Sequence, residues 1–280
     1  MRSIWVPTAA AALSMLIPIG SVARAEQGAS AAPSSEELAK KLSNPISDLV
    51  SVPFQFNWDN GVGTEDDLRF ILNVQPVVPF TLNENWNLIG RWIVPFVSQP
   101  ELAPGSGTTF GTGDIVASGF FSPSNSSGGL TWGVGPVCSL PTTTDPLLGS
   151  GKWSAGPTAV ALKQQGPWTY GGLVNHLVDV ADTGDPERSD VNQSFLQPFL
   201  AFTTKQAVTY NVSSEATANW EASSGEEWTI PINVNVSKIT KFGPFPLSLG
   251  GGAGYFIESP PGGPEWKLRF QATILLPRGP

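Results

Sequence analysis

The sequence has little charge, one cysteine, one histidine and no long apolar run after its first residues. Only 14% of the residues are Asp, Glu, Lys or Arg, well below the usual quarter or so. Because Cys138 is the single cysteine, no internal disulfide can form. No later segment reaches the roughly eighteen apolar residues of a membrane helix. If the chain lies in a membrane, it must therefore span it as a closed barrel.

The net charge of −8 argues against a nucleic-acid partner. Glycine and proline are abundant, with 30 and 26 residues, as in some disordered chains. The regular alternation of apolar and polar residues described below argues against disorder.

The N-terminal stretch MRSIWVPTAAAALSMLIPIGSVARAEQ predicts a secretory signal peptide. Arg2 precedes an apolar run that ends in the small-residue pattern around Ala25, so we expect cleavage after Ala25. A membrane anchor is the alternative, which the short run and its two prolines disfavour. We divide the chain into a signal peptide (1–25), a periplasmic N-terminal segment (26–48) and a barrel (49–280).

A short helix is expected in PSSEELAKKLSNP, within the periplasmic segment. Ser34 and Glu37 have the spacing of a capping box, and Asn44 with Pro45 ends the helix. The helix is too short to be stable alone in water. We favour a place in the periplasm, with a plug in the barrel mouth as the alternative.

Strict two-residue alternation predicts long strands. In residues 227–238 and 265–276 every second side chain is apolar. Such lengths fit the nine to eleven or so residues of a membrane-spanning strand better than the average strand of soluble domains. Twelve strands are predicted, at 50–58, 67–79, 86–97, 113–122, 130–141, 157–164, 168–179, 193–203, 207–220, 227–238, 244–257 and 265–276.

The connections alternate between short turns and longer loops, which is the plan of an outer-membrane barrel. The fold class is therefore all-β, an antiparallel transmembrane barrel of about 12 strands. With the N-terminus in the periplasm, the short turns are periplasmic and the long loops extracellular. Most acidic residues, Asp59 among them, are expected in those loops.

Prolines interrupt several of these strands. Pro76, Pro79 and Pro95 lie toward strand ends, where the missing N–H is tolerated. Pro231 lies in the middle of a strand, and there we expect a bulge or a break in the ladder.

Six tryptophans occur at matching strand ends, where the aromatic girdles of a membrane barrel lie. A core position is the alternative for each tryptophan taken alone. The predicted girdle consists of Trp58, Trp86, Trp168, Trp220, Trp228 and Trp266.

Several long segments resemble a bacterial outer-membrane family. They include QPVVPFTLNENWNLIGRWIVP, KWSAGPTAVALKQQGPWTYGGLVNH and FIESPPGGPEWKLRF, and the resemblance covers nearly the whole mature chain. Family members are labelled phenol-degradation meta-pathway proteins or transporters, and some are mislabelled neuromedin U. The resemblance implies an outer-membrane barrel that passes small, in part aromatic, organic molecules. The family supplies no catalytic residues. Outer-membrane barrels usually end on an aromatic residue that is used in assembly, whereas the last strand here ends in ILLPRGP and its last aromatic residue is Phe270.

The polar face of each strand is assigned to the lumen. Two interpretations stay open: the charges oppose each other across a pore, or they pair and fill it. The predicted lumen-lining residues are Gln55, Asn57, Arg69, Asn73, Gln75, Asn87, Arg91, Asp114, Asn175, Asp179, Gln197, Asn211, Glu215, Asn233, Asn235, Lys267, Arg269 and Gln271.

His176, the only histidine, is assigned a structural or interface role. No serine follows it closely and no Gly-x-Ser-x-Gly motif is present, although a facing strand could supply a nucleophile. The acidic loop DTGDPERSD (182–190) contains enough oxygen ligands for Ca²⁺, but its spacing is not that of an EF-hand, and a solvated loop is favoured. We expect no catalytic residues, cofactor or metal.

The expected function is uptake of small organic solutes through the outer membrane. The expected partners are outer-membrane lipid, lipopolysaccharide, the transported solute and the barrel-assembly machinery. One alternative is a plugged structural or ligand-binding barrel without transport. A weaker one is a soluble periplasmic barrel with its apolar faces turned inward around a ligand.

Overall fold

The computed structural model describes residues 33–276 except 103, 104, 106, 126, 127, 185–187 and 244. The predicted signal peptide and its cleavage site lie outside the described residues. Within the described part of the chain, no helix is both long enough and apolar enough to cross a membrane.

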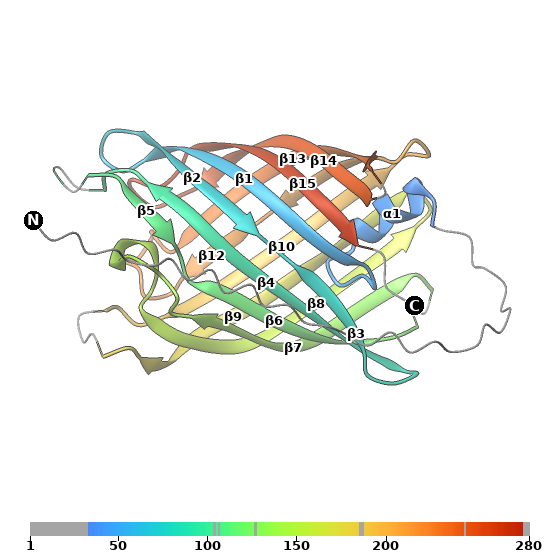
Figure 1. Cartoon of the computed structure of the whole chain (residues 1–280). Helices are drawn as coiled ribbons and strands as arrows, with labels where there is room; N and C mark the ends of the chain where they lie inside the picture. The colour runs from blue at the N-terminus through green and yellow to red at the C-terminus, as the bar shows by residue number, and fades with distance from the viewer. Residues whose placement is uncertain are drawn as a thin grey trace, which may run out of the picture. The chain divides into compact units, whose positions relative to one another are not determined.

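The strands of the described chain form one antiparallel sheet that closes on itself where β15 pairs with β1 (Figure 1). One helix, α1 (Ser35–Leu42), precedes them, and a single turn of 3₁₀ helix spans Pro146–Leu148. The strands are β1 (Val50–Val62), β2 (Asp67–Val74), β3 (Val77–Thr81), β4 (Trp86–Gln99), β5 (Thr109–Thr112), β6 (Ile115–Pro123), β7 (Leu130–Leu140), β8 (Lys152–Gln165), β9 (Trp168–Asp182), β10 (Asn192–Thr203), β11 (Val208–Ser214), β12 (Ala216–Asn219), β13 (Trp228–Phe242), β14 (Phe245–Glu258) and β15 (Trp266–Leu276).

The barrel wall has 12 strands, as predicted, because three of them are each split into two segments. β2 and β3 both lie between β1 and β4, and β11 and β12 both lie between β10 and β13. β5 and β6 likewise both pair with β4. The largest difference from the predicted ranges is at β8, which begins at Lys152 and not at residue 157.

Prolines account for two of the splits. The wall strand formed by β2 and β3 is interrupted at Gln75 and Pro76. The gap between β11 and β12 is at Glu215, opposite Pro231 in the register of β13. The pairing of β13 with β14 also shifts between Ile230 and Pro231. The predicted break in the ladder at Pro231 is therefore confirmed on both sides of β13, because proline has no N–H to donate.

Successive side chains point to opposite sides of the wall. The outer side is apolar over much of its area, with exposed residues such as Val174, Leu200, Val234, Leu268 and Phe270. Polar residues of the wall strands, including Asn57, Asn233 and Arg269, are buried inside the barrel. A wall that is apolar outside and polar inside is the pattern of a membrane barrel.

The two ends of the barrel differ. We call the end with the short β3–β4, β8–β9 and β10–β11 connections the turn end, and the opposite end the loop end. Helix α1 lies at the turn end (Figure 1). Its capping box is present, because the Ser34 Oγ accepts from the Glu37 N–H and the Ser34 N–H donates to the Glu37 carboxylate.

Candidate functional site

The main polar site lies inside the barrel and depends on glycines of β14. Gly252 and Gly254 face inward, where any side chain would collide with Asn235 and Asn233. A Cβ at Gly254 would also lie 2.9 Å from Cγ of Lys267. The glycines leave the inner surface of β14 bare, so that long side chains on both sides of β14 can extend over it.

Glu215 and Arg269 meet across this bare strand. The guanidinium Nη1 and Nη2 of Arg269 donate to the two carboxylate oxygens of Glu215 at 2.8 and 2.7 Å. Arg269 Nε also donates to Oδ1 of Asn57 at 2.7 Å. A bidentate, charge-assisted contact of this kind is among the strongest that side chains make. The bond to Asn57 joins β15 to β1, at the two ends of the barrel sequence.

Asp59 extends the network along β1. Its carboxylate lies 2.9 Å from Arg69 Nη2 and 3.9 Å from Lys267 Nζ. Lys267 Nζ is also 4.0 Å from Glu215. The expectation that Asp59 belongs to an outer loop is wrong, because β1 continues to Val62 and Asp59 is buried inside the barrel. Its position two residues after Asn57 was the sequence signal for the inner face.

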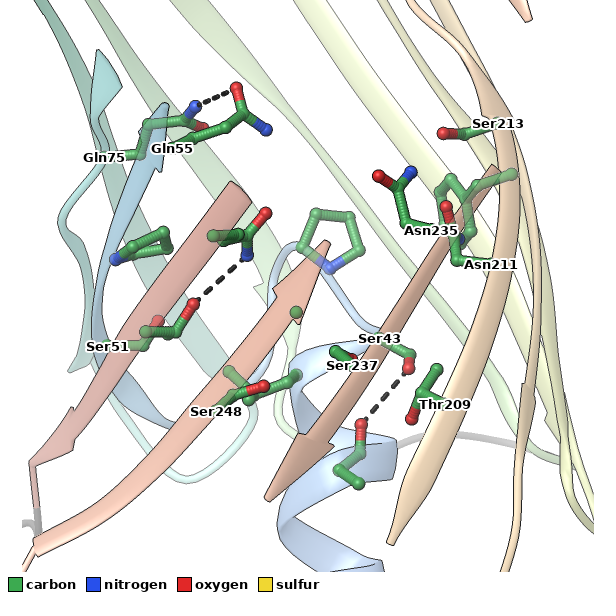
Figure 2. Close-up of a pocket in the computed structure, with 18 of the residues that line it drawn as sticks. Ser43, Ser51, Gln55, Gln75, Thr209, Asn211, Ser213, Asn235, Ser237 and Ser248 are labelled. Atoms are coloured by element: carbon green, nitrogen blue, oxygen red, sulfur yellow. Dashed lines mark hydrogen bonds between the residues drawn. The ribbon is translucent and has the colours of Figure 1, made fainter. Parts of the chain in front are cut away.

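A second branch of the network crosses to β4. Arg91 Nη2 donates to Gln75 Oε1 at 3.0 Å, and Gln75 Nε2 donates to Gln55 Oε1 at 3.2 Å (Figure 2). Asn73 Nδ2 lies 3.5 Å from the same Gln55 oxygen. The network thus contains two anionic side chains and four cationic ones, so its net charge is positive. The anions are Asp59 and Glu215, and the cations are Arg69, Arg91, Lys267 and Arg269.

Beside this network lies a cavity of about 260 Å³. Its polar lining comes from both sides of the barrel (Figure 2). Nine of the predicted lumen residues lie on its wall: Gln55, Gln75, Arg91, Gln197, Asn211, Glu215, Asn235, Arg269 and Gln271. The structure therefore brings together residues that are more than two hundred positions apart in the sequence. Their role in solute passage stays a prediction.

The opposite part of the interior is apolar. Ile89, Phe120, Val160, Leu162 and Leu173 are buried there in one cluster, with Phe195 and Phe199 packed against it. These side chains come from β4, β6, β8, β9 and β10. The assignment of polar faces to the lumen could not find them, because both faces of these strands are largely apolar.

The segment before β1 closes the turn end. Leu38 and Ala39 of α1 pack against Ala207, Ile239 and Leu275, and Gln164 Nε2 donates to the Lys40 carbonyl at 2.9 Å. In the structure the helix thus takes the arrangement weighed as the alternative, a plug in the barrel mouth, and does not lie apart from the barrel.

Ile46 continues this closure further into the barrel. It is 3% exposed and belongs to the apolar cluster of the interior. Asn44 Oδ1 accepts the N–H of Ile46 at 2.9 Å and fixes the turn that directs the side chain inward. Ala39 and Ser47 also line the cavity. The cavity is thus bounded by the N-terminal segment at the turn end and by the charged network.

Two predicted lumen residues instead hold loops. Asp114 accepts hydrogen bonds from the N–H and hydroxyl of Ser150 at 2.6 and 2.9 Å, and Asp179 accepts the N–H of Val191 at 2.9 Å. Neither lines the cavity. Of the remaining predicted residues, Asn87 and Asn175 are half-buried, and Asn233 is buried beside Gly254.

Part of the acidic loop surrounds a cation of the protein itself. Lys152 Nζ lies 2.5 Å from Asp190, 3.1 Å from Asp182 and 3.9 Å from Asp179. Lys152 was missed because the predicted strand began five residues later. Asp185 and Glu187 of the same loop lie outside the described residues.

The predicted girdle tryptophans lie at the ends of the outer wall. Trp86, Trp168, Trp220 and Trp266 are exposed, and Trp58 is on the same outward side as Phe56 and packs on Phe70. Trp228 packs edge-to-face on Trp220 with ring centroids 5.8 Å apart. Trp132 and Trp153 are exposed tryptophans that the predicted girdle did not include.

Comparison with known proteins identifies the fold. No protein-family model matches the sequence, and no curated protein matches it. Among solved structures, an outer membrane channel from Pseudomonas putida F1 is 14% identical with a TM-score of 0.62, over 81% of this chain and 94% of that one. The porin NanC is 7% identical with a TM-score of 0.54, over 82% of this chain and 100% of that one. This chain thus has the closed β-barrel fold of these outer-membrane proteins.

Proposed function

We propose that the protein is an outer-membrane channel for uptake of small organic molecules that combine a polar or anionic group with an apolar or aromatic body. The observation that carries the proposal is the two-sided interior. Arg91 and Arg269 lie on the cavity wall, and the cluster around Phe120 and Leu173 forms the opposite part of the interior. A solute with both kinds of surface is favoured by a site that offers both.

The proposal includes the location and orientation of the chain. The predicted signal peptide, with expected cleavage after Ala25, supports export, and the apolar outer wall and the tryptophans at both wall ends support insertion in the outer membrane. The turn end then faces the periplasm and the loop end faces outward. The resemblance to the phenol-degradation meta-pathway family supports an aromatic solute class, and lipid, lipopolysaccharide and the assembly machinery would be the partners.

Passage in this proposal requires movement of the N-terminal segment. Ile46 and α1 occupy the turn end, where packing and the hydrogen bond from Gln164 hold the segment against the wall. Local opening of such a segment is expected to cost less than unfolding the barrel. Solutes would enter at the loop end, cross the charged network and leave when the segment moves.

A second candidate is a ligand-binding or structural barrel without transport. The ion pairs of Glu215 with Arg269 and the buried Ile46 favour it, since both reduce the free space of the interior. The exposed apolar outer wall argues against a soluble barrel with inward apolar faces, and extraction into buffer without detergent would support that weaker alternative.

The two main candidates separate in a solute-uptake experiment. The mature protein is reconstituted in liposomes, and swelling is followed with sugars, aromatic carboxylic acids and neutral aromatic alcohols of matched size. A channel should admit aromatic acids faster than sugars of the same size. Swelling no faster than in protein-free liposomes, for every solute, would contradict transport and favour the plugged barrel.

A further inference from the structure

The outer wall carries a polar pair between β9 and β10, beside exposed apolar residues. His176 of β9 and Ser194 of β10 are direct partners in the antiparallel register, and His176 Nδ1 lies 2.9 Å from Ser194 Oγ. The adjacent outward pair toward the turn end is Val174 and Leu196, and both are exposed. Ser194 is the facing-strand hydroxyl that the sequence alone could not place beside His176.

Trp220 fixes the direction of the hydrogen bonds at Ser194. Its indole Nε1 lies 2.9 Å from the same Oγ, and an indole N–H can only donate. Ser194 Oγ therefore accepts from Trp220, and its own proton is directed to His176 Nδ1 when the imidazole is neutral. A serine hydroxyl that donates to a neutral imidazole is the arrangement of an activated nucleophile and its general base.

The tryptophans beside His176 and Ser194 place this pair at the height on the wall where the ester bonds of membrane lipids lie. Trp220 and Trp228 stack edge-to-face at the loop end of the wall, and tryptophan favours the headgroup region of a bilayer. Toward the turn end, Val174 and Leu196 continue the apolar surface. An acyl chain along those residues would bring its ester carbonyl near Ser194.

We propose that Ser194 is the nucleophile of an acyl-ester hydrolase site on the membrane-facing wall, with His176 as its general base and membrane lipid as the substrate class. Ser194 Oγ bonds to the ester carbonyl carbon while its proton passes to His176 Nδ1. The ester C–O bond then breaks, and His176 returns the proton to the departing alcohol oxygen.

Water completes the reaction. It attacks the acyl carbon, its proton passes to His176 and then to Ser194 Oγ, and a free fatty acid leaves. Within the described chain the His176 ring makes no second hydrogen bond, so no carboxylate orients it as in a triad. We expect slow turnover and clear covalent labelling. This activity is separate from the proposed channel and departs from the expectation that the protein has no catalytic residue.

Covalent labelling of the purified full-length protein tests the proposal. Folded protein in detergent micelles is treated with hexadecyl sulfonyl fluoride, and intact mass and peptide mapping locate the adduct. We expect one adduct, at Ser194, that is lost in Ser194→Ala and forms at least about tenfold more slowly in His176→Phe. Trp220→Phe keeps the ring contact with Trp228 and should slow labelling less. Ser223→Ala, in an exposed loop, is the matched control.

Fatty-acid release from phospholipid vesicles containing the protein is the second measurement. Release by the wild type that is absent in Ser194→Ala supports the site. The electrophoretic shift between folded and heated barrel verifies that each variant is folded. No adduct on the folded wild type, or equal labelling rates in wild type and folded His176→Phe, would overturn the proposal.

Discussion

The two halves of the barrel interior differ in how their residues are held. In the polar half, hydrogen bonds join Arg269 to Glu215 across the bare glycines of β14, and Arg69 to Asp59. Lys267 lies about 4 Å from both carboxylates. In the apolar half, Phe120, Leu162 and Leu173 are held by packing alone. In the proposed channel, the polar half would set charge selectivity, and the apolar half would set the size and apolarity of the solutes that fit.

The largest expected effect comes from removing the anion of the polar half. Glu215→Ala leaves Arg269 and Lys267 without their shared carboxylate, and breaking one partner of a buried pair costs about 3–5 kcal/mol. Thermal unfolding of the barrel in detergent should occur at a markedly lower temperature. Glu221→Ala, which removes an exposed loop carboxylate, is the control. Unchanged stability of Glu215→Ala would mean that the network contributes little.

Ile46→Ala tests the apolar half and the closure of the turn end together. Truncation of a buried isoleucine costs about 2–5 kcal/mol, and here the loss falls on the docking of the N-terminal segment. Single-channel recordings should show a larger or longer-lived open state. Lys41→Ala, which removes an exposed ion pair with Asp48, should behave as wild type. Identical recordings for all three proteins would show that the segment does not gate the barrel.

Arg91→Ala and Arg269→Ala test the charge of the polar half. Each removes one positive charge from the cavity wall, so the preference of the open channel should shift from anions toward cations. The reversal potential under a salt gradient measures this shift. Values equal to those of wild type in both variants would remove these residues from the conduction path.

The smallest effect concerns pH and the capping box of α1. Hydrogen bonds from the Ser34 N–H, and then from its hydroxyl, lower the pKa of Glu37 below its usual value of 4.5. A lowered folded pKa means that the cap stabilises the helix above pH 4.5 and that this contribution is lost as pH falls through the folded value.

Opening of the turn end should therefore increase slightly in acid below that value. Glu37→Gln, which cannot titrate, should lack this dependence in recordings across the same pH range. The same acid response in both proteins would assign it to another group.

Much of the wall could be predicted, because alternation along each strand fixes both its existence and its inner face. Asn57, Arg91 and Arg269 were found in this way. Asp59 and Lys152 were missed because strand ends are poorly marked in a single sequence. The apolar half was missed for a different reason. Val160 and Leu173 face inward on strands whose outer faces are also apolar, so the alternation does not show which face of the strand points into the barrel.

Contacts between strands were beyond the sequence. The pairing of His176 with Ser194, and of Glu215 with Arg269, depends on the register and closure of the barrel, which no local pattern specifies. The helix was predicted from Ser34, Glu37 and Pro45, but its place in the barrel mouth depends on the tertiary contacts of Leu38 and Ile46.

Block of ion current by small solutes tests the two-sided interior most directly. Current through the Ile46→Ala protein in planar bilayers is recorded while benzoate, acetate or benzyl alcohol is added. Benzoate has both a ring and a charge, and we predict that it interrupts the current at a lower concentration than acetate, which lacks the ring, or benzyl alcohol, which lacks the charge. Equal potency of the three solutes, or no current at all, would contradict the account.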